Sequence, residues 1–406
     1  MQVVHERCCG LDVHKASVVA CLMTPEGKEI RTVKTLTATL LELVDWLKTA
    51  GCTHVAMEST GVYWKPIYNL LEGEGMTLLV VNARHMKAVP GRKTDVKDAE
   101  WICDLLRHGL LKPSFIPDRP QRELAELLRY RRSLIGERAR EINRIQKVLE
   151  GANIKLAGTI ANVLGVGGRA VLDALVTGIE EPDALASRIS TNVRATREEL
   201  EAALTGRMGD HQRAMLSVQL RHIDFLDGEI AELDAAIGER LRPFAEAMSR
   251  LDKIPGVGVR TAQEILAAIG TDMSRFPTHR HLASWARLCP GTHESAGKRS
   301  SAGTGKGNTP LREALVEAAN AVSRSRKPSY LLAQYHRLAA RRGRKRAVVA
   351  VAHSILVIAY YLLRDGKPYK DLGSLHFDER DRELVVRRAV KRLEALHLKV
   401  TVEPAA

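Results

Sequence analysis

The six cysteines of this 406-residue chain form no pattern that suits a metal site or a disulfide framework. No two cysteines are spaced as a Cys-x-x-Cys pair, and no histidine stands at the spacing that zinc sites use. The N-terminus lacks the apolar region of a secretory signal peptide. We therefore expect a reduced, cytosolic chain without structural zinc. The cysteines are Cys8, Cys9, Cys21, Cys52, Cys103 and Cys289.

Long apolar runs are also scarce, and only the segment 347–363 invites comparison with a membrane span. It follows the cationic run 341–346, an arrangement that imitates a positive-inside anchor. However, the segment lies at the lower end of the roughly 17 to 25 residues that a span needs, and His353 and Ser354 stand in its middle. We predict a helix buried in the core of a domain and no membrane partner.

Acidic residues are outnumbered: 62 Lys and Arg stand against 48 Asp and Glu, which gives a formal charge of +14. Such a surface attracts polyanions, so nucleic acid is the leading partner, and a merely basic globular protein is the alternative that charge alone leaves open. Residues 324–346 contain nine Lys or Arg and no acid, interspersed with Tyr330 and Tyr335. This run predicts a cationic face that contacts a nucleic-acid backbone.

The length excludes a mini-protein and allows two or three domains, each with its own core. The first hundred residues alternate strand-like runs with helical patterns, which is typical of an α/β layer. We predict strands at 7–13, 17–23, 29–36, 53–57 and 76–81 and helices at 40–48 and 62–71, with Pro25-Glu26-Gly27 as a hairpin turn. The order βββαβαβ resembles the RNase H-like fold.

From Asp118 onward the periodicity becomes helical, and apolar residues recur every seven positions in two separate stretches. These stretches predict two long helices that form a coiled-coil arm or a dimer seam, or else an ordinary amphipathic pair packed on a domain. Residues 151–207 between them are rich in Gly and Ala and carry no recognisable chemistry. The repeats are Leu128, Ile135, Ile142 and Leu149, with Leu127 and Leu134 beside them, and Leu216, Ile223, Ile230, Ile237 and Phe244, with Leu226 and Leu233 beside them.

Four acids are the strongest candidates for chemistry: Asp12, Glu58, Asp95 and Asp98. Asp12 ends the first predicted strand, Glu58 follows the fourth, and the other two are three residues apart, so they share a helix face. Carboxylates that converge at one edge of a sheet suit Mg²⁺, and two such ions can activate a scissile phosphate. Taken singly, each acid is better explained as a helix cap or a surface charge, and only their combination at strand ends favours the metal site. Neighbouring Lys93 fits an entering phosphate.

A glycine-containing turn at 254–262, with Gly256, Gly258 and Arg260, matches the helix-hairpin-helix pattern. Glycines allow close approach of a phosphate, and free N–H groups at the start of the next helix point toward it. Binding of this kind is independent of base sequence and sensitive to salt. An ordinary interhelix turn is the alternative.

The segment 293–308 is cationic, rich in glycine and hydroxyls, and predicted to be a flexible loop that contacts DNA through Lys298, Arg299 and Lys306. It is not a phosphate-binding P-loop, because Gly307 stands where Ser or Thr is required. A serine among these cations could attack a phosphodiester and hold it covalently. The spacing alone does not select Ser295 over Ser300 or Ser301.

Together these motifs resemble one family over nearly the whole chain: the DEDD transposases of the IS110 group, including its IS1111 branch, which are guided by a bridge RNA. The segments that carry the resemblance are Gly10-Leu11-Asp12-Val13-His14-Lys15, Glu58-Ser59-Thr60-Gly61-Val62-Tyr63, Val81-Asn82, Lys93-Thr94-Asp95-Val96-Lys97-Asp98-Ala99, Ile254-Pro255-Gly256-Val257-Gly258, Glu294-Ser295-Ala296-Gly297-Lys298 and Lys306-Gly307-Asn308.

The resemblance implies a RuvC-like (RNase H-like) domain at 1–117, a coiled-coil arm at 118–249, a mostly helical transposase domain at 250–365 and a charged tail at 366–406. It implies that Asp12, Glu58, Asp95 and Asp98 bind Mg²⁺ and that Ser295 is the nucleophile. Donor and target DNA are then cut and rejoined through a phosphoserine link. It also implies a noncoding guide RNA that pairs with both DNAs, which explains the absence of base-reading motifs. Family members assemble as dimers of dimers with composite sites.

The sequence leaves two other functions open. One is a RuvC-like, structure-selective nuclease in which metal-activated water attacks the phosphate. The other is a non-catalytic, architectural DNA- or RNA-binding protein that uses the glycine turn and the basic residues Arg341, Arg342, Arg344, Lys345 and Arg346 alone.

Overall fold

The computed structural model describes residues 2–59, 61–81, 95–190, 193–289, 293–295, 298–300 and 307–403. Lys93 and Lys306 lie outside these ranges, and for Asp95, Ser295, Lys298 and Arg299 only the backbone is described. The chain divides into two compact units, Met1–Arg119 and Pro120–Ala406.

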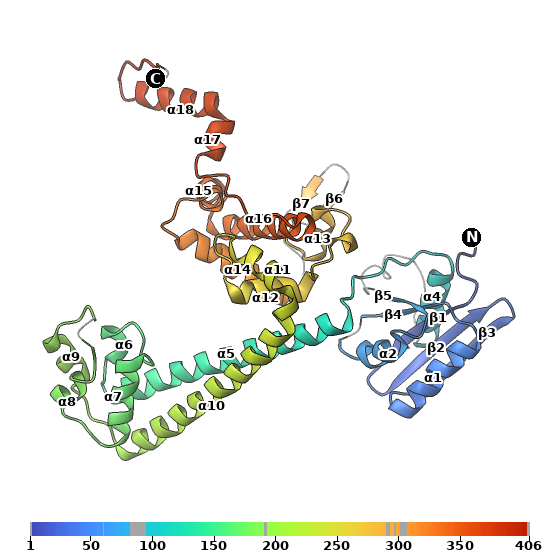
Figure 1. Ribbon diagram of the computed structural model, residues 1–406, viewed down its shortest axis with the longest axis horizontal. Helices are drawn as coiled ribbons and strands as arrows, with labels where there is room; N and C mark the ends of the chain where they lie inside the picture. The colour runs from blue at the N-terminus through green and yellow to red at the C-terminus, as the bar shows by residue number, and fades with distance from the viewer. Residues whose placement is uncertain are drawn as a thin grey trace. The chain divides into compact units, whose positions relative to one another are not determined.

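The first unit is built on a five-stranded mixed sheet in the order β3-β2-β1-β4-β5 (Figure 1). The pairs β1–β2 and β2–β3 are antiparallel, whereas β1–β4 and β4–β5 are parallel. Every strand and helix predicted for the first 81 residues is present, in the predicted order, with ends shifted by a few residues. The elements are β1 (Cys8–Val13), β2 (Ser17–Thr24), β3 (Gly27–Lys34), α1 (Thr37–Thr49), β4 (His54–Glu58), α2 (Trp64–Leu71), β5 (Thr77–Val81) and α4 (Asp95–Arg107).

Alternation along β1 separates the two faces of this sheet. Cys9, Leu11 and Val13 pack into one core with side chains of α1 and α2. Cys8 belongs to a second core, formed with Cys103 and other side chains of α4. Helices therefore cover both faces, and α4 covers the face to which Cys8, Gly10 and Asp12 belong.

Five of the six thiols lie in these cores, and only Cys289 is half-exposed. Burial raises the pKa of Cys52 to about 12 and raises the pKa of Cys9 well above its ordinary value. A buried, protonated thiol is a poor nucleophile.

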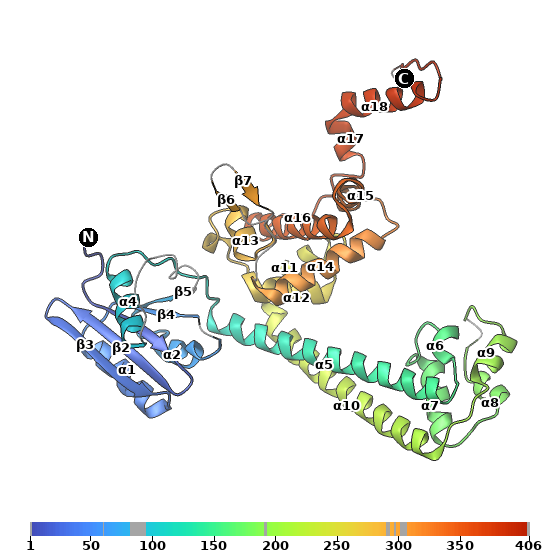
Figure 2. The same ribbon diagram turned by 180° about the vertical axis from the view of Figure 1, so that it is seen from behind.

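The second unit contains the two long helices that the seven-residue repeats predict, α5 (Arg119–Gly151) and α10 (Asp210–Leu241). They lie side by side and antiparallel in Figures 1 and 2. Ion pairs join Arg131 to Asp234 at 2.5 Å and Arg138 to Asp227, and Leu134 packs against Leu226 and Ile230. The repeats thus form a seam between two helices of one chain.

One residue of the predicted seam, Phe244, lies outside the long helix to which the sequence assigned it. Phe244 continues the seven-residue step in sequence, but α10 ends at Leu241 and Phe244 lies in a short 3₁₀ turn with 39% of its surface exposed. Pro243 explains the break, because its ring removes a backbone N–H and disfavours continuation of an α-helix.

The segment between the two long helices, for which the sequence showed no clear pattern, folds over its described residues (152–190 and 193–208) into a small helical cap at the far end of the α5–α10 pair (Figure 1). Its own apolar side chains, such as Leu172 and Leu200, share one core with Ile145, Leu216 and Ile223 of the long helices. Short helices are difficult to recognise from periodicity, because each has only about one to three turns. They are α6 (Leu156–Thr159), α7 (Val166–Val176), α8 (Pro182–Ala186) and α9 (Arg197–Leu204).

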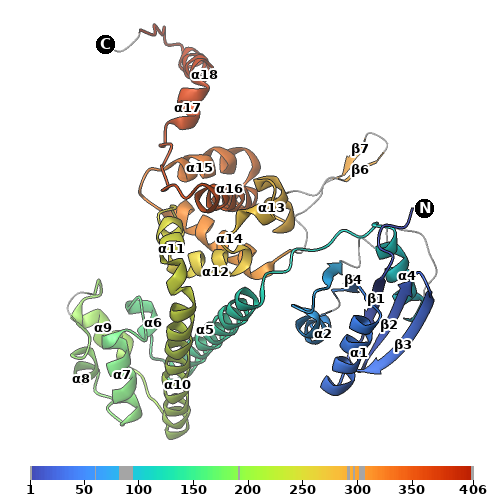
Figure 3. The ribbon, with the colours of Figure 1, turned by 45° about the vertical axis from the view of Figure 1, so that its right-hand side comes forward.

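The remaining helices form a compact body around α16 (Arg344–Asp365) (Figure 3). By length and composition α16 could cross a membrane, and it is the only such helix in the described part of the chain. It packs against α11 (Ala245–Asp252), α13 (His279–Trp285), α14 (Thr309–Arg324) and α15 (Tyr330–Arg342), and half of its most apolar stretch is buried. The structure confirms the predicted core helix. The body also contains α12 (Val259–Ile269), and a tail with α17 (His376–Arg380) and α18 (Arg382–Glu394) follows.

The burial pattern predicts one fast-reacting thiol. In the native protein at neutral pH, an aromatic disulfide reagent should modify Cys289 within minutes and the other five cysteines only as fast as the protein unfolds. Absorbance of the released thiolate, with a guanidinium-denatured sample as the six-thiol control, measures this ratio. Rapid modification of two or more native thiols would contradict the fold of the first unit.

Candidate functional site

Asp12 and Glu58 are brought to one edge of the sheet by strand register. Because β1 and β4 are parallel and Leu11 pairs with Met57, the next residues along the two strands are Asp12 and Glu58. Asp12 shares a face with Cys8 and Gly10, and Glu58 shares that same face with Ala56, whose side chain packs on α4. Both acids therefore end adjacent strands on the face that α4 covers.

Helix α4 supplies the other two acids to this edge. Its backbone lies so close to β1 that a Cβ on Gly10 would stand 2.4 Å from the carbonyl oxygen of Ala99 and 2.4 Å from the nitrogen of Cys103. The Sγ atoms of Cys8 and Cys103 are 3.8 Å apart. These two contacts orient α4 antiparallel to β1, so its first turn, with Asp95 and Asp98, lies toward the strand end that carries Asp12.

The carboxylate of Asp12 contacts His14, which is not among the candidate residues named from the sequence. His14 Nε2 lies 3.0 Å from Asp12 Oδ2, and the Asp12 side chain is only 15% exposed. Because side chains two residues apart along a strand lie on the same face, the sequence itself places residues 14 and 12 on one side at the end of β1. We therefore add His14 to the candidate site as a residue that orients the Asp12 carboxylate.

Asp12, Glu58 and Asp98 are all half-buried and carry only oxygen donors, which is the donor set that Mg²⁺ prefers. Among the described side chains, which exclude that of Asp95, no three acids, histidines or cysteines are arranged as a finished metal-binding group. The backbone thus gathers the quartet at one edge of the sheet, while the coordination geometry stays a prediction.

The second unit carries the predicted serine on a short β-hairpin rather than on a structureless loop. Strand β6 (His293–Ser295) pairs antiparallel with β7 (Lys298–Ser300), and Ser295 is the register partner of Lys298. The hairpin stands out from the helical body in Figure 3. The strands are too short and too polar to show the alternation by which a strand is recognised in sequence.

Gly307 lies where the chain rejoins the helical body after the hairpin, and it packs closely against Ala286 and Arg287. A Cβ at this position would stand 2.8 Å from the carbonyl oxygen of Ala286 and 2.8 Å from the Cβ of Arg287. Asn308 then caps α14 by accepting a hydrogen bond from the N–H of Leu311. The glycine that rules out a P-loop is therefore required by close packing.

The glycine-containing turn joins α11 to α12, as predicted, but its two glycines have different roles. Gly256 has φ +83° and faces α14, where a Cβ would meet the carbonyl oxygen of Ala318 at 2.4 Å. Gly258 precedes the first turn of α12, has open space around it and lies beside exposed Arg260. Only the second glycine is placed for close approach of a phosphate; the first is needed for helix packing.

The basic residues at the junction of α15 and α16 are all exposed: Arg341, Arg342, Arg344, Lys345 and Arg346. Gly343, with φ +80°, ends one helix and begins the next, so the chain turns sharply within the run. The turn concentrates five cations at one place on the second unit.

Two stretches of the chain match models of known protein families. Residues 9–154, which include the acidic quartet, match a transposase family model of the DEDD type from IS110. Residues 248–336, which include the serine hairpin, match the model described as the transposase IS116/IS110/IS902 family. The two matches together cover more than half of the chain. The chain belongs to the IS110/IS116 family of insertion-sequence transposases.

Curated relatives of this transposase agree with the assignment. The transposase for insertion sequence element IS1111A of Coxiella burnetii is 28% identical over 89% of this chain and 90% of its own length. A pilin gene-inverting protein of Moraxella bovis is 34% identical over 34% of this chain and 45% of its own length. An uncharacterized protein of insertion element IS116 from Streptomyces clavuligerus is 27% identical over 74% and 80%.

The close contact between β1 and α4 in this transposase should make its stability sensitive to any side chain larger than that of Gly10. The Gly10→Ala methyl group would overlap backbone atoms of α4, so we expect a loss of about 2–3 kcal/mol in the free energy of unfolding and displacement of the acids on α4. Gly228→Ala in α10 is the matched control, because a Cβ there meets nothing and should stabilise the helix by up to about 1 kcal/mol. Urea denaturation followed by circular dichroism compares them. Equal stability of Gly10→Ala and the parent would contradict the packing.

Proposed function

We propose that this transposase cuts and rejoins DNA by serine chemistry assisted by Mg²⁺ and guided by a noncoding RNA. The observation that carries the proposal is the strand register that sets Asp12 beside Glu58 under the first turn of α4. The strand order β3-β2-β1-β4-β5, with three antiparallel strands continued by two parallel ones, supports an RNase H-like first domain. The serine nucleophile and the guide RNA are proposed because the chain resembles this family.

In the proposed site Asp12, Glu58, Asp95 and Asp98 hold Mg²⁺, with His14 fixing the carboxylate of Asp12. Mg²⁺ bound there would neutralise the charge of a scissile phosphate and stabilise the leaving oxygen. Four carboxylates at one sheet edge repel one another, so a cation is also needed for them to approach closely. The residues fit the ion in chemistry and in backbone placement.

Ser295 is the proposed nucleophile. Its Oγ attacks phosphorus, the serine proton passes to a base, and one P–O bond to deoxyribose breaks as the serine–phosphate bond forms. A deoxyribose hydroxyl of the new strand then attacks the same phosphorus and releases the serine. Each step exchanges one phosphodiester for another, so the reaction needs no external energy source. Lys298, the register partner of Ser295, is suitably placed on the hairpin to attract the phosphate.

Nucleic acid is held, in this proposal, by sequence-independent contacts. Gly258 and Arg260 open the first turn of α12, and the exposed cations of the α15–α16 junction add a backbone-binding surface. Target choice is then left to base pairing by the bridge RNA. A dimer of dimers, with composite sites, is the assembly that the family resemblance favours, and the cytosol is the proposed compartment.

Adduct formation tests the chemistry. Incubation with Mg²⁺, labelled DNA spanning an end of the insertion element, target DNA and RNA transcribed from the noncoding flanks should give a covalent protein–DNA species on a denaturing gel. Ser295→Ala should abolish it, and Asp12→Asn should lower its rate by roughly 10²–10³-fold, since metal-assisted charge stabilisation contributes several kcal/mol.

Two control variants sharpen this result. Ser300→Ala, which removes another hydroxyl of the same hairpin, should retain the adduct, and so should Asp45→Asn, which neutralises an exposed acid of α1. Hydrolysed DNA without an adduct would instead support the structure-selective nuclease. Recombination that persists unchanged in Asp12→Asn would refute the metal site.

A further inference from the structure

A cavity of about 650 Å³ lies between α14 and α16 in the second unit. Thr309, the first residue of α14, and Arg344, the first residue of α16, both line it, so the positive ends of two helix dipoles meet at one place. Gly307 also lines it, which puts the cavity at the point where the serine segment returns to the body. No motif in the sequence indicated it, because its walls come from two helices whose first residues are 35 positions apart in sequence.

The charge of the lining favours an anion. Arg312, Arg344 and Lys345 contribute three cations against the single acid Glu313. Glu313 is already paired with Arg132 of α5 at 2.7 Å. Within the described part of the chain, Arg344 and Lys345 have no acidic partner, so their charge is available to a phosphate.

The other lining residues include apolar side chains, which a phosphate alone would not need. Val316, Val348 and Val349 form an apolar wall, and Asn320 places an amide, with both donor and acceptor, on the same side of α14. A volume of this size fits a small organic group, and it is too small for a duplex. An apolar wall next to cations and an amide matches the parts of one nucleotide: a flat base with polar edges, and a phosphate.

We propose that this cavity binds a single unstacked nucleotide of the nucleic acid that the transposase handles. The base lies against the three valines, Asn320 faces its edge, and the phosphate meets Arg344 and Lys345. The inference rests on the proposed function only in requiring that the chain bind nucleic acid. It predicts a contact to one base in addition to the backbone contacts.

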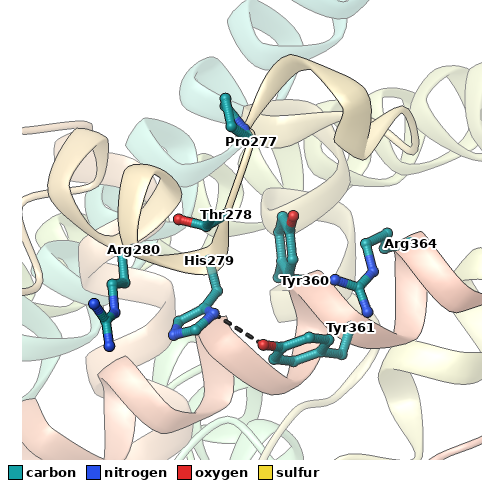
Figure 4. Close-up of a pocket in the computed structure, with 7 residues that line it drawn as sticks. All are labelled: Pro277, Thr278, His279, Arg280, Tyr360, Tyr361 and Arg364. Carbon is teal, nitrogen blue, oxygen red and sulfur yellow. Dashed lines mark hydrogen bonds between the residues drawn. The ribbon is translucent and has the colours of Figure 1, made fainter.

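A smaller pocket of about 290 Å³ lies between α13 and the C-terminal part of α16 (Figure 4). It is richer in aromatic side chains, but its polar groups bind one another. The hydroxyl of Tyr361 lies 2.9 Å from His279 Nδ1, Tyr360 donates a hydrogen bond to the carbonyl oxygen of Phe276, and Arg364 pairs with Asp365. The first contact joins α13 to α16, the second joins α16 to the segment before α13, and the third lies within α16. Two cations of the larger cavity, in contrast, have no acidic partner in the described residues.

Homopolymers with and without bases test the proposal without requiring a known guide. Fluorescently labelled (dT)₁₀, (rU)₁₀ and a ten-residue abasic deoxyribose strand carry the same backbone phosphates, so backbone-only binding gives similar affinities. We expect the full-length protein to prefer the strand with bases by on the order of tenfold, from burial of a base against the valines. A preference in DNA alone, or in RNA alone, identifies which nucleic acid supplies the nucleotide.

Filling the cavity should remove this preference. Val349→Trp and, independently, Val316→Phe should lower the ratio toward one while affinity for the abasic strand is kept. Val402→Trp, at an exposed position of the tail, adds the same ring elsewhere and should leave the ratio at the parent value. Circular dichroism melting establishes that the variants are folded.

Equal affinity of the parent for strands with and without bases would overturn the proposal, as would failure to bind any strand. A preference that survives both filling substitutions would also overturn it. Because this assay involves no strand cleavage, loss of the Ser295 adduct in the earlier experiment would refute the serine chemistry and leave the cavity result unaffected.

Discussion

The close contact of two backbones at Gly10 is the constraint on which the first unit depends. Helix α4 approaches β1 so closely that only glycine fits between them, and the buried thiols of Cys8 and Cys103 continue the same contact. A helix held at this distance has little freedom to slide, because protein interiors are close-packed. Packing next to the acids therefore fixes the position of the turn that carries Asp95 and Asp98 relative to the strand that carries Asp12.

In the second unit, Arg132 of α5 holds separate helices together through ion pairs. Its guanidinium binds Glu264 of α12 at 3.0 Å and Glu313 of α14 at 2.7 Å, which ties the long helix pair to the helical body. Burial raises the pKa of Glu264, although the charge of Arg132 opposes that change. Through these two ion pairs Arg132 joins the arm to α12, the helix that follows the glycine turn, and to α14, which lines the proposed nucleotide cavity.

Sequence reasoning succeeded where one residue pattern determines one local structure. Alternation predicted the strands of the sheet, the seven-residue step predicted α5 and α10, and His353 with Ser354 distinguished the core helix α16 from a membrane span. It failed where structure arises from packing between distant segments. The helical cap at 152–208, the different roles of Gly256 and Gly258, and the contact of His14 with Asp12 all depend on neighbours that the local sequence does not specify. The candidate acids were found in sequence, but their common edge became evident only from strand register.

We propose that the ends of β1 and β4 and the first turn of α4 together form one metal site. Replacing Mg²⁺ by Fe²⁺ with ascorbate and peroxide cleaves a protein backbone near the bound ion, and mass spectrometry locates the cuts. Such a shared site should give cuts near residues 12, 58 and 95–98 together, and these cuts should be suppressed by excess Mg²⁺ and lost together in Asp12→Asn. Cuts at only one of these segments, or cuts that Asp12→Asn leaves unchanged, would contradict it.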